Sequence, residues 1–202
     1  FGVALGLWLI ASSVIELKRR AVHLPRVFRL PARVWGMSLA HLGLGLFVIG
    51  AVVEMTQRYE TTLDLAIGEQ AEVAGWTVTL EDMAMIEGPN WEAQRADLVI
   101  RRGDSQALLQ PEKRFYPAAR MPTTETAIHK TGTGDFYAAL GDRRVVDGEL
   151  RWTFRAYYNP LIDVLFAGVI LMTIGGGVAV AGRRRGARLR DTQAEAAGQA
   201  AE

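Results

Sequence analysis

Long uncharged apolar stretches constrain this sequence more than any other feature. One runs from about Trp35 to Met55 and has no charge before Glu54, and another runs from about Leu161 to Gly182 with Asp163 as its only charge. A helix needs roughly 20 apolar residues to cross the hydrocarbon core of a bilayer. We therefore expect residues 35–55 and 161–182 to be transmembrane helices.

The chain opens inside a third, shorter apolar stretch, residues 1–17. There is no leading Met and no basic segment before it, as a signal peptide would have. We expect this stretch to be a transmembrane helix truncated at its start, and the chain to be part of a longer protein.

Basic residues predict the orientation of these helices. Residues 18–34 contain six Lys and Arg residues and no acid, and residues 183–202 open with five arginines before an Ala- and Glu-rich tail. The positive-inside rule places both stretches in the cytoplasm, the second as a basic and then disordered tail. Residues 58–160 are then expected on the outer side of the membrane.

The outer stretch alternates between apolar and polar residues, as β-strands do. Val73, Trp76, Val78 and Leu80 alternate with polar residues, and turn residues such as Gly88-Pro89-Asn90 follow. This pattern predicts six to eight strands in a small sandwich or barrel. The expected fold is therefore a membrane protein with three transmembrane helices and a mainly β extracytoplasmic domain.

Composition excludes several chemistries. The chain has no cysteine, so thiolate metal sites, disulfides and cysteine nucleophiles are excluded. The formal net charge of +1 gives no indication of a nucleic-acid partner. No Ser-His-Asp arrangement and no close carboxylate pair is visible in the sequence.

His41 is the informative candidate residue, because it lies inside the expected helix 35–55. Ionisable groups at such a depth usually face a partner, a cavity or a cofactor. Ser38 and Gly45 lie on the same side of the helix and would let a flat group approach the backbone. The imidazole could be an axial haem ligand or could bond to a neighbouring helix, and the residues alone leave both readings open.

Other candidates fit surface positions better. His23 is expected in the basic loop, and His129 on the surface of the outer domain. Arg114 and Arg120 could contact a carboxylate, since arginine pairs with carboxylates through two bonds, although strand surface is the commoner role of such runs.

Several short strings follow one another in a fixed order along the chain. They are Ser38-Leu39-Ala40-His41-Leu42-Gly43, Gly88-Pro89-Asn90-Trp91, Glu112-Lys113-Arg114-Phe115-Tyr116, Met121-Pro122-Thr123-Thr124-Glu125, Tyr137-Ala138-Ala139-Leu140-Gly141 and Tyr157-Tyr158-Asn159-Pro160. In this order they resemble the C-terminal portion of the CcmF family, the haem lyases of bacterial cytochrome c maturation. The resemblance runs from the first apolar stretch to Arg190.

The resemblance implies a function, a cofactor and partners. Members of the family join the vinyl groups of haem to apocytochrome c as thioethers, in the inner membrane and periplasm. His41 matches one of two histidines that hold a haem b, with Ser38 and Gly45 as possible packing positions. Implied partners are the haem chaperone CcmE, apocytochrome c, subunits such as CcmH, and membrane lipid. The chain alone would not be an active lyase.

Two other classes remain open from the sequence. One is a non-catalytic membrane anchor that displays a β-domain for docking, in which His41 binds nothing. The other is a subunit of a haem transporter, which would be expected to have more polar residues in its helices.

Overall fold

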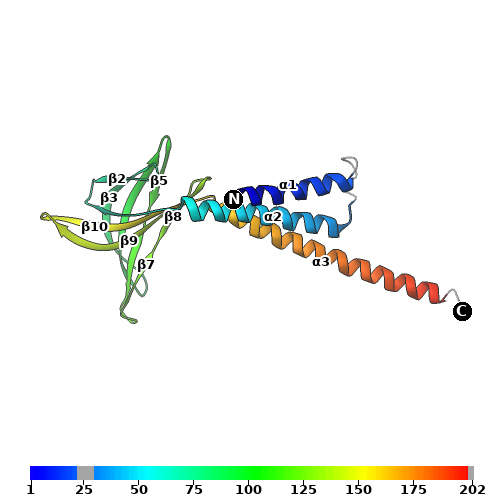
Figure 1. The fold of residues 1–202 in the computed structure, drawn as a ribbon. Helices are drawn as coiled ribbons and strands as arrows, with labels where there is room; N and C mark the ends of the chain where they lie inside the picture. The colour runs from blue at the N-terminus through cyan, green and yellow to red at the C-terminus, as the bar shows by residue number, and fades with distance from the viewer. Residues whose placement is uncertain (22–29, 200–202) are drawn as a thin grey trace. The chain divides into compact units, whose positions relative to one another are not determined.

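The computed structural model describes residues 1–21 and 30–199, with side chains as far as Arg183. The chain divides into two compact units, one of residues 1–55 and 162–202 and the other of residues 56–161. Figure 1 shows helices in the first unit and strands in the second. The expected loop residues His23, Arg26 and Arg29 lie outside the described residues.

Three helices are described in the first unit. They are α1 (Gly2–Ala21), α2 (Ala32–Gln57) and α3 (Ile162–Gln199). Within the described residues, α2 and the part of α3 up to Arg183 are long and apolar enough to cross a membrane, with mean hydropathies of 1.9 and 2.3. The shorter α1 is not among these candidate spans.

The helix α3 is longer than the sequence predicted. We expected residues 183–190 to be a basic stretch beyond the helix and residues 191–202 to be a disordered tail, but the helix continues as far as Gln199. The physical reason is local, because this stretch is rich in Arg and Ala, which are strong helix formers.

Glycines bring the three helices into close contact. Gly36, Gly43 and Gly50 recur at intervals of seven along α2, and a Cβ on any of them would lie within 2.8 Å of α3 backbone atoms. On another side of α2, Gly45 lies against Gly6 of α1, whose carbonyl oxygen would be 2.8 Å from such a Cβ. Small residues at helix interfaces allow this approach, and here they run the length of α2.

Ten strands make up the described part of the second unit, more than the six to eight predicted. They are β1 (Tyr59–Leu65), β2 (Gln70–Val73), β3 (Trp76–Glu87), β4 (Glu92–Arg102), β5 (Ser105–Leu109), β6 (Glu112–Tyr116), β7 (Met121–Glu125), β8 (Ala127–Lys130), β9 (Gly134–Val146) and β10 (Glu149–Pro160). The additional strands are short and polar, so their alternation is weak in the sequence.

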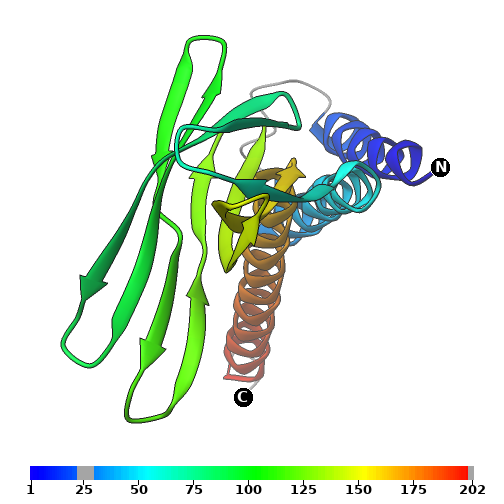
Figure 2. The ribbon, with the colours of Figure 1, turned by 90° about the vertical axis from the view of Figure 1, so that its left-hand side faces the viewer.

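The strands form two antiparallel sheets. Sheet A has the order β1-β10-β9-β8, and sheet B has the order β2-β3-β4-β6-β7 with β5 also paired to β4. Figure 2 views these strands after a quarter turn from Figure 1. Strand β4 is long enough to pair β6 along its first half and β5 along its second.

The core lies between the two sheets. Phe136 and Phe154 of sheet A and Leu80, Leu98 and Ile100 of sheet B are fully buried in one cluster. Each fully buried side chain of this size contributes about 1.5–3 kcal/mol relative to exposure. The second unit therefore has its own hydrophobic core, as a sandwich domain requires.

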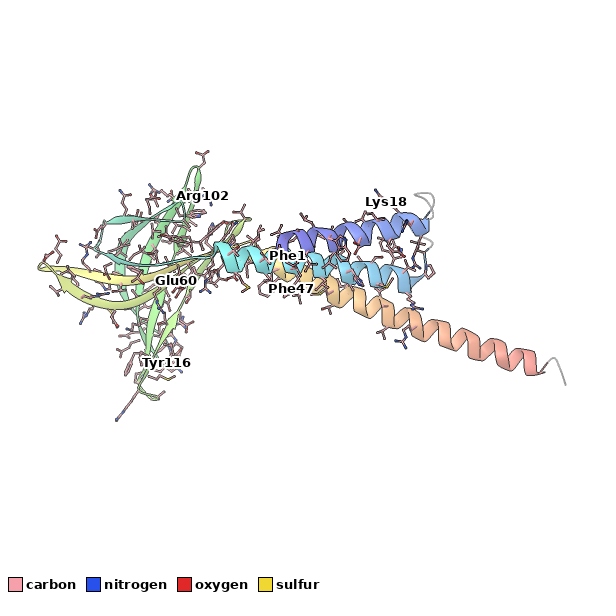
Figure 3. The ribbon with its side chains drawn as sticks, viewed as in Figure 1. Phe1, Lys18, Phe47, Glu60, Arg102 and Tyr116 are labelled. Atoms are coloured by element: carbon pink, nitrogen blue, oxygen red, sulfur yellow. The ribbon has the colours of Figure 1, made fainter. Side chains whose placement is uncertain are left out.

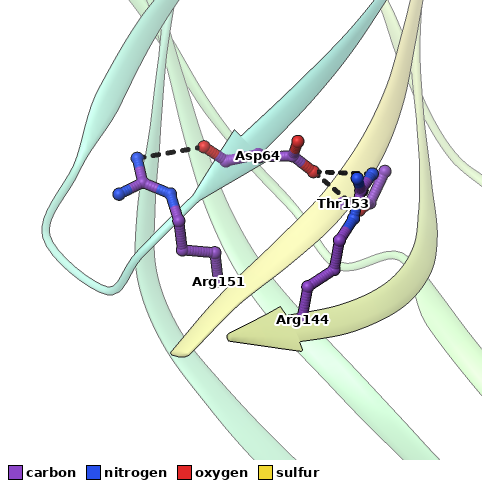
Figure 4. A network of polar contacts seen from close by, with 4 residues as sticks. All are labelled: Asp64, Arg144, Arg151 and Thr153. Atoms are coloured by element: carbon purple, nitrogen blue, oxygen red, sulfur yellow. Dashed lines mark hydrogen bonds and ion pairs between the residues drawn. The ribbon is translucent and has the colours of Figure 1, made fainter. Parts of the chain in front are cut away.

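A network of polar contacts connects strand β1 of sheet A to the hairpin of β9 and β10. The Asp64 carboxylate accepts a hydrogen bond of 2.7 Å from the Thr153 hydroxyl and lies 3.2 Å from the Arg144 guanidinium. Arg151 donates to the Asp64 carbonyl and also pairs with Glu69, as Figure 4 shows for the contacts around Asp64. Residues far apart in sequence are thus joined across sheet A.

Candidate functional site

His41 lies in the first half of α2 and its imidazole is exposed in the described structure. Its Nδ1 lies 2.8 Å from the carbonyl oxygen of Met37, one helical turn earlier. Because a carbonyl oxygen only accepts, Nδ1 carries the proton of this hydrogen bond. The other nitrogen, Nε2, then presents its lone pair away from the helix backbone, as metal-binding histidines do.

A groove between α1 and α2 lies beside this imidazole. It has a volume of about 400 Å³ and is lined mainly by apolar surface. Its lining residues are Trp8, Leu9, Ser12, Ser13, Glu16, Met37, Ser38 and His41. His41 is therefore part of a groove wall built by two helices.

Three serines line the groove in different ways. The Ser12 and Ser13 hydroxyls donate back to carbonyls of their own helix, at 2.7 Å to Trp8 and 2.9 Å to Leu9. Ser38 is buried, and its hydroxyl has no hydrogen-bond partner among the described residues. A buried hydroxyl without a partner costs free energy, so Ser38 has a donor available for a group in the groove.

The other flank of His41 faces α3. A second groove of about 490 Å³ there is lined by Arg33, Gly36, Met37, Ala40, His41, Gly176, Ala179 and Arg183. Gly182 of α3 lies beside Ala32 and Arg33, so the basic residues Arg33 and Arg183 mark the same end of the helical unit. A group bound at Nε2 could be reached from either flank.

Gly45 has a structural explanation apart from this groove. It lies against Gly6 and Ile10 of α1, at distances that leave no room for a Cβ. Close packing of α1 against α2 therefore explains why position 45 is a glycine. Of the two small residues singled out with His41, Ser38 is the one that lines the groove.

Sequence reasoning missed the contribution of α1. Trp8, Ser12 and Glu16 are spaced by four residues and so form one stripe on α1, which lines the groove opposite His41. Glu16 pairs with Arg20, one turn further on, at 2.5 Å. The sequence feature that could have indicated this groove is the presence of Ser12, Ser13 and Glu16, at helical spacing, inside an apolar stretch.

The other candidates lie in the β-domain. The His129 ring packs edge-on to Trp76, with ring centroids 5.9 Å apart, so it is half-buried rather than a free surface residue. Arg120 is exposed in the turn between β6 and β7. Neither adjoins a metal-binding group, because the described side chains, those of residues 1–21 and 30–183, form no cluster of three or more His, Asp or Glu residues suited to a metal ion.

Arg114 is already occupied by contacts inside the domain. Its guanidinium lies 4.4 Å from the centre of the Trp91 ring and pairs with Glu112 at 2.8 Å and Glu125 at 3.8 Å. The hydrogen bond with Glu112 is the main cause that raises the pKa of Arg114 above its usual value. Arg114 therefore stabilises the hairpins through these contacts and is not a free arginine for a carboxylate ligand.

Fold and groove together define a class: apolar helices joined to a β-sandwich, with a histidine exposed as a potential metal ligand. Comparison with known proteins makes the class specific. The CcmF C-terminal beta-sandwich family matches residues 56–160. The chain belongs to the CcmF family and corresponds to its C-terminal portion.

Individual relatives support this assignment. The cytochrome c-type biogenesis protein ccl1 of Rhodobacter capsulatus is 38% identical over 182 residues, which cover 89% of this chain and 27% of that protein. CcmF of Escherichia coli is 31% identical over 176 residues, covering 87% of this chain and 26% of that protein. The chain thus spans about a quarter of the length of these relatives.

A solved structure has the same fold. The chain named cytochrome c heme lyase CcmF matches with a TM-score of 0.65 and 19% identity, over 88% of this chain and 30% of that one. At this identity the similarity concerns the fold.

Proposed function

We propose that this chain is the C-terminal part of a cytochrome c haem lyase. In this proposal the longer protein joins haem to apocytochrome c through thioethers in the periplasm, and the present chain supplies half of a haem b site in the membrane. Its relatives are cytochrome c-type biogenesis proteins, which supports the reaction class. Catalysis by the longer protein would depend on residues outside this chain as well.

His41 carries the proposal. Its Nδ1 is held by the Met37 carbonyl, so its orientation is fixed and Nε2 can serve as an axial ligand of haem iron. The adjoining groove is apolar and large enough for part of a flat macrocycle, with the unpartnered Ser38 hydroxyl in its wall. Haem b held in this way would supply one-electron chemistry, and its second ligand would come from outside this chain.

The helices α2 and α3 would place the protein in the bacterial inner membrane. Lys18, Arg19 and Arg20 lie in the last turn of α1, and Arg33 and Arg183 lie together at one end of the helical unit. With this basic end in the cytoplasm, the chain between α2 and α3 lies on the periplasmic side. Haem chaperone CcmE, apocytochrome c and subunits such as CcmH would meet the protein there.

The direct test is the variant His41→Ala in the full-length protein. It should lower the haem b content of the purified protein and stop cytochrome c maturation, while the amount of protein stays near normal. Ser12→Ala is a matched control, because it changes the same groove without removing a ligand nitrogen. A His41→Ala protein with unchanged haem and a normal maturation yield would favour the alternative of a non-catalytic anchor.

A further inference from the structure

The groove between α2 and α3 differs in charge from the groove between α1 and α2. Arg33 and Arg183 line it together with the His41 imidazole, and no acidic residue is among the described side chains of its wall. In the α1 groove the charged side chain is an acid, Glu16, which pairs with Arg20. Of the two flanks of His41, the α3 flank is therefore the positively charged one.

Both arginines of this groove are available to a ligand. Their side chains are exposed, and within residues 1–21 and 30–183 no carboxylate lies within ion-pair distance of either guanidinium. A Cβ on Gly182 would lie 3.1 Å from the Arg33 backbone nitrogen, so α3 brings Arg183 next to Arg33. Figure 3 shows this end of the helical unit, where Lys18 is labelled on α1. Two neighbouring guanidiniums can each pair with a carboxylate through two parallel N–H groups.

The wall of the groove between the arginines and His41 contains a glycine that helix packing does not explain. Gly176 lies seven residues before Arg183, so the two residues share a face of α3. No described atom lies within 4 Å of a Cβ built on Gly176, whereas a Cβ on Gly175 would lie 2.5 Å from the Ala40 nitrogen. Contact with α2 therefore explains Gly175, and the bare backbone at Gly176 leaves room for a flat ligand.

A haem bound at Nε2 of His41 would reach both grooves, because the axial bond is perpendicular to the ring and the imidazole lines both. The two propionates of haem extend from one edge of the ring, and the opposite edge is apolar. Arg33 precedes His41 by eight residues, which is about 12 Å along α2 at the rise of an α-helix. Half of the ring, a propionate and an arginine side chain together cover this separation.

We propose that Arg33 and Arg183 pair with the two propionate carboxylates of the haem b whose iron His41 binds. The propionate edge then lies in the positively charged α3 groove, and the apolar edge lies in the α1 groove. The inference rests on the proposed function, because it takes His41 as the axial ligand. Its support is a chemical match: one groove has an imidazole and two unpaired guanidiniums, and one ligand has a metal and two neighbouring carboxylates.

An anionic phospholipid is the alternative occupant of the two arginines. Basic pockets between transmembrane helices on the cytoplasmic side bind phosphate headgroups, and phosphate accepts hydrogen bonds from arginine as a carboxylate does. A headgroup would leave the His41 imidazole of the same groove without a role, so the groove favours haem. The experiment separates the two by blocking the carboxylates of haem and by measuring bound phospholipid.

The test compares haem with haem dimethyl ester, in which both carboxylates are blocked. The full-length protein, purified from haem-deficient cells, is titrated with each form in detergent, and binding is followed in the Soret band. The double variant Arg33→Gln/Arg183→Gln should lower the wild-type preference for haem over its ester by about tenfold, because charge-assisted hydrogen bonds are lost. Arg19→Gln is the matched control, since Arg19 is exposed in the last turn of α1 and lines neither groove. It should keep the wild-type preference.

A double variant with the wild-type preference would refute the pairing with propionates. If that variant instead loses bound phosphatidylglycerol, measured by mass spectrometry of the purified protein, the arginines hold lipid headgroups. An equal loss of preference in Arg19→Gln would also refute the pairing, because the overall charge of this end would then be the cause.

The variant His41→Ala tests the haem proposal separately. It should remove the low-spin spectrum with either form of haem, whereas the double arginine variant should retain that spectrum, which also shows that its helices are intact. If His41→Ala keeps the low-spin spectrum, the haem proposal itself fails. If His41→Ala removes it and the double variant keeps the wild-type preference, the pairing alone fails.

Discussion

The contact between α2 and α3 makes a quantitative prediction for Gly43→Ala. An added Cβ at Gly43 would lie 2.6 Å from the Met172 nitrogen and 2.7 Å from the Gly168 carbonyl oxygen. Comfortable contacts are about 3.5 Å, so the helices would have to separate by roughly 0.8 Å. Both opposing atoms belong to the backbone and cannot move aside as a side chain could, so overpacking should cost about 1–3 kcal/mol.

Gly176→Ala is the matched control, because nothing lies within 4 Å of a Cβ at that position of α3. Both variants gain the same helix propensity of up to about 1 kcal/mol, so their difference isolates the packing cost. Reversible unfolding by SDS in mixed micelles, followed by far-ultraviolet circular dichroism, should rank Gly43→Ala below Gly176→Ala by about 1–3 kcal/mol. If Gly43→Ala is at least as stable as Gly176→Ala, the glycine contact is not what holds these helices together.

Three further predictions concern the β-domain and the topology. The bond from the Ala66 amide, followed by that from Arg151, lowers the pKa of Glu69 below its ordinary value of 4.5. The contribution of the ionised Glu69 carboxylate to stability is therefore complete above that pH and is lost as the pH falls through the lower pKa of the folded state. In the Glu69→Gln variant, the melting temperature should depend less steeply on pH below about 4.5. An unchanged slope would contradict this. Gly88→Ala should displace the Trp91 ring from Gly88 and change the near-ultraviolet circular dichroism, whereas an unaltered spectrum would mean that the ring does not need a glycine there. Reporter fusions after Arg20 and Arg185 should report cytoplasm and a fusion near Gly103 the periplasm; a cytoplasmic signal near Gly103 would reverse the orientation.

Strong periodic patterns made parts of this fold predictable from the sequence. The alternation from Trp76 to Leu80 marked a strand of the sandwich, and the uncharged run after Trp35 marked α2. The strands β6, β7 and β8 have four or five residues each and mixed polarity. Strand β6 pairs with β4 across the intervening β5, and the mixed polarity of all three strands leaves only a weak alternation in the sequence, so local patterns could not reveal them.

The candidate site was predictable only in its central residue. His41 stood out because it is ionisable within an apolar helix, and Ser38 followed from helical spacing. The groove itself depends on how α1 packs against α2, which brings in Trp8 and Glu16.

The central claim is that the His41 imidazole binds haem iron in the longer protein. The most direct measurement is the visible spectrum of the purified full-length His41→Gly variant, with and without added imidazole. Loss of one axial ligand should remove the low-spin haem b spectrum, and free imidazole should restore part of it by filling the vacant position. A variant that keeps the full low-spin spectrum without imidazole would contradict the claim and leave helix packing as the role of His41.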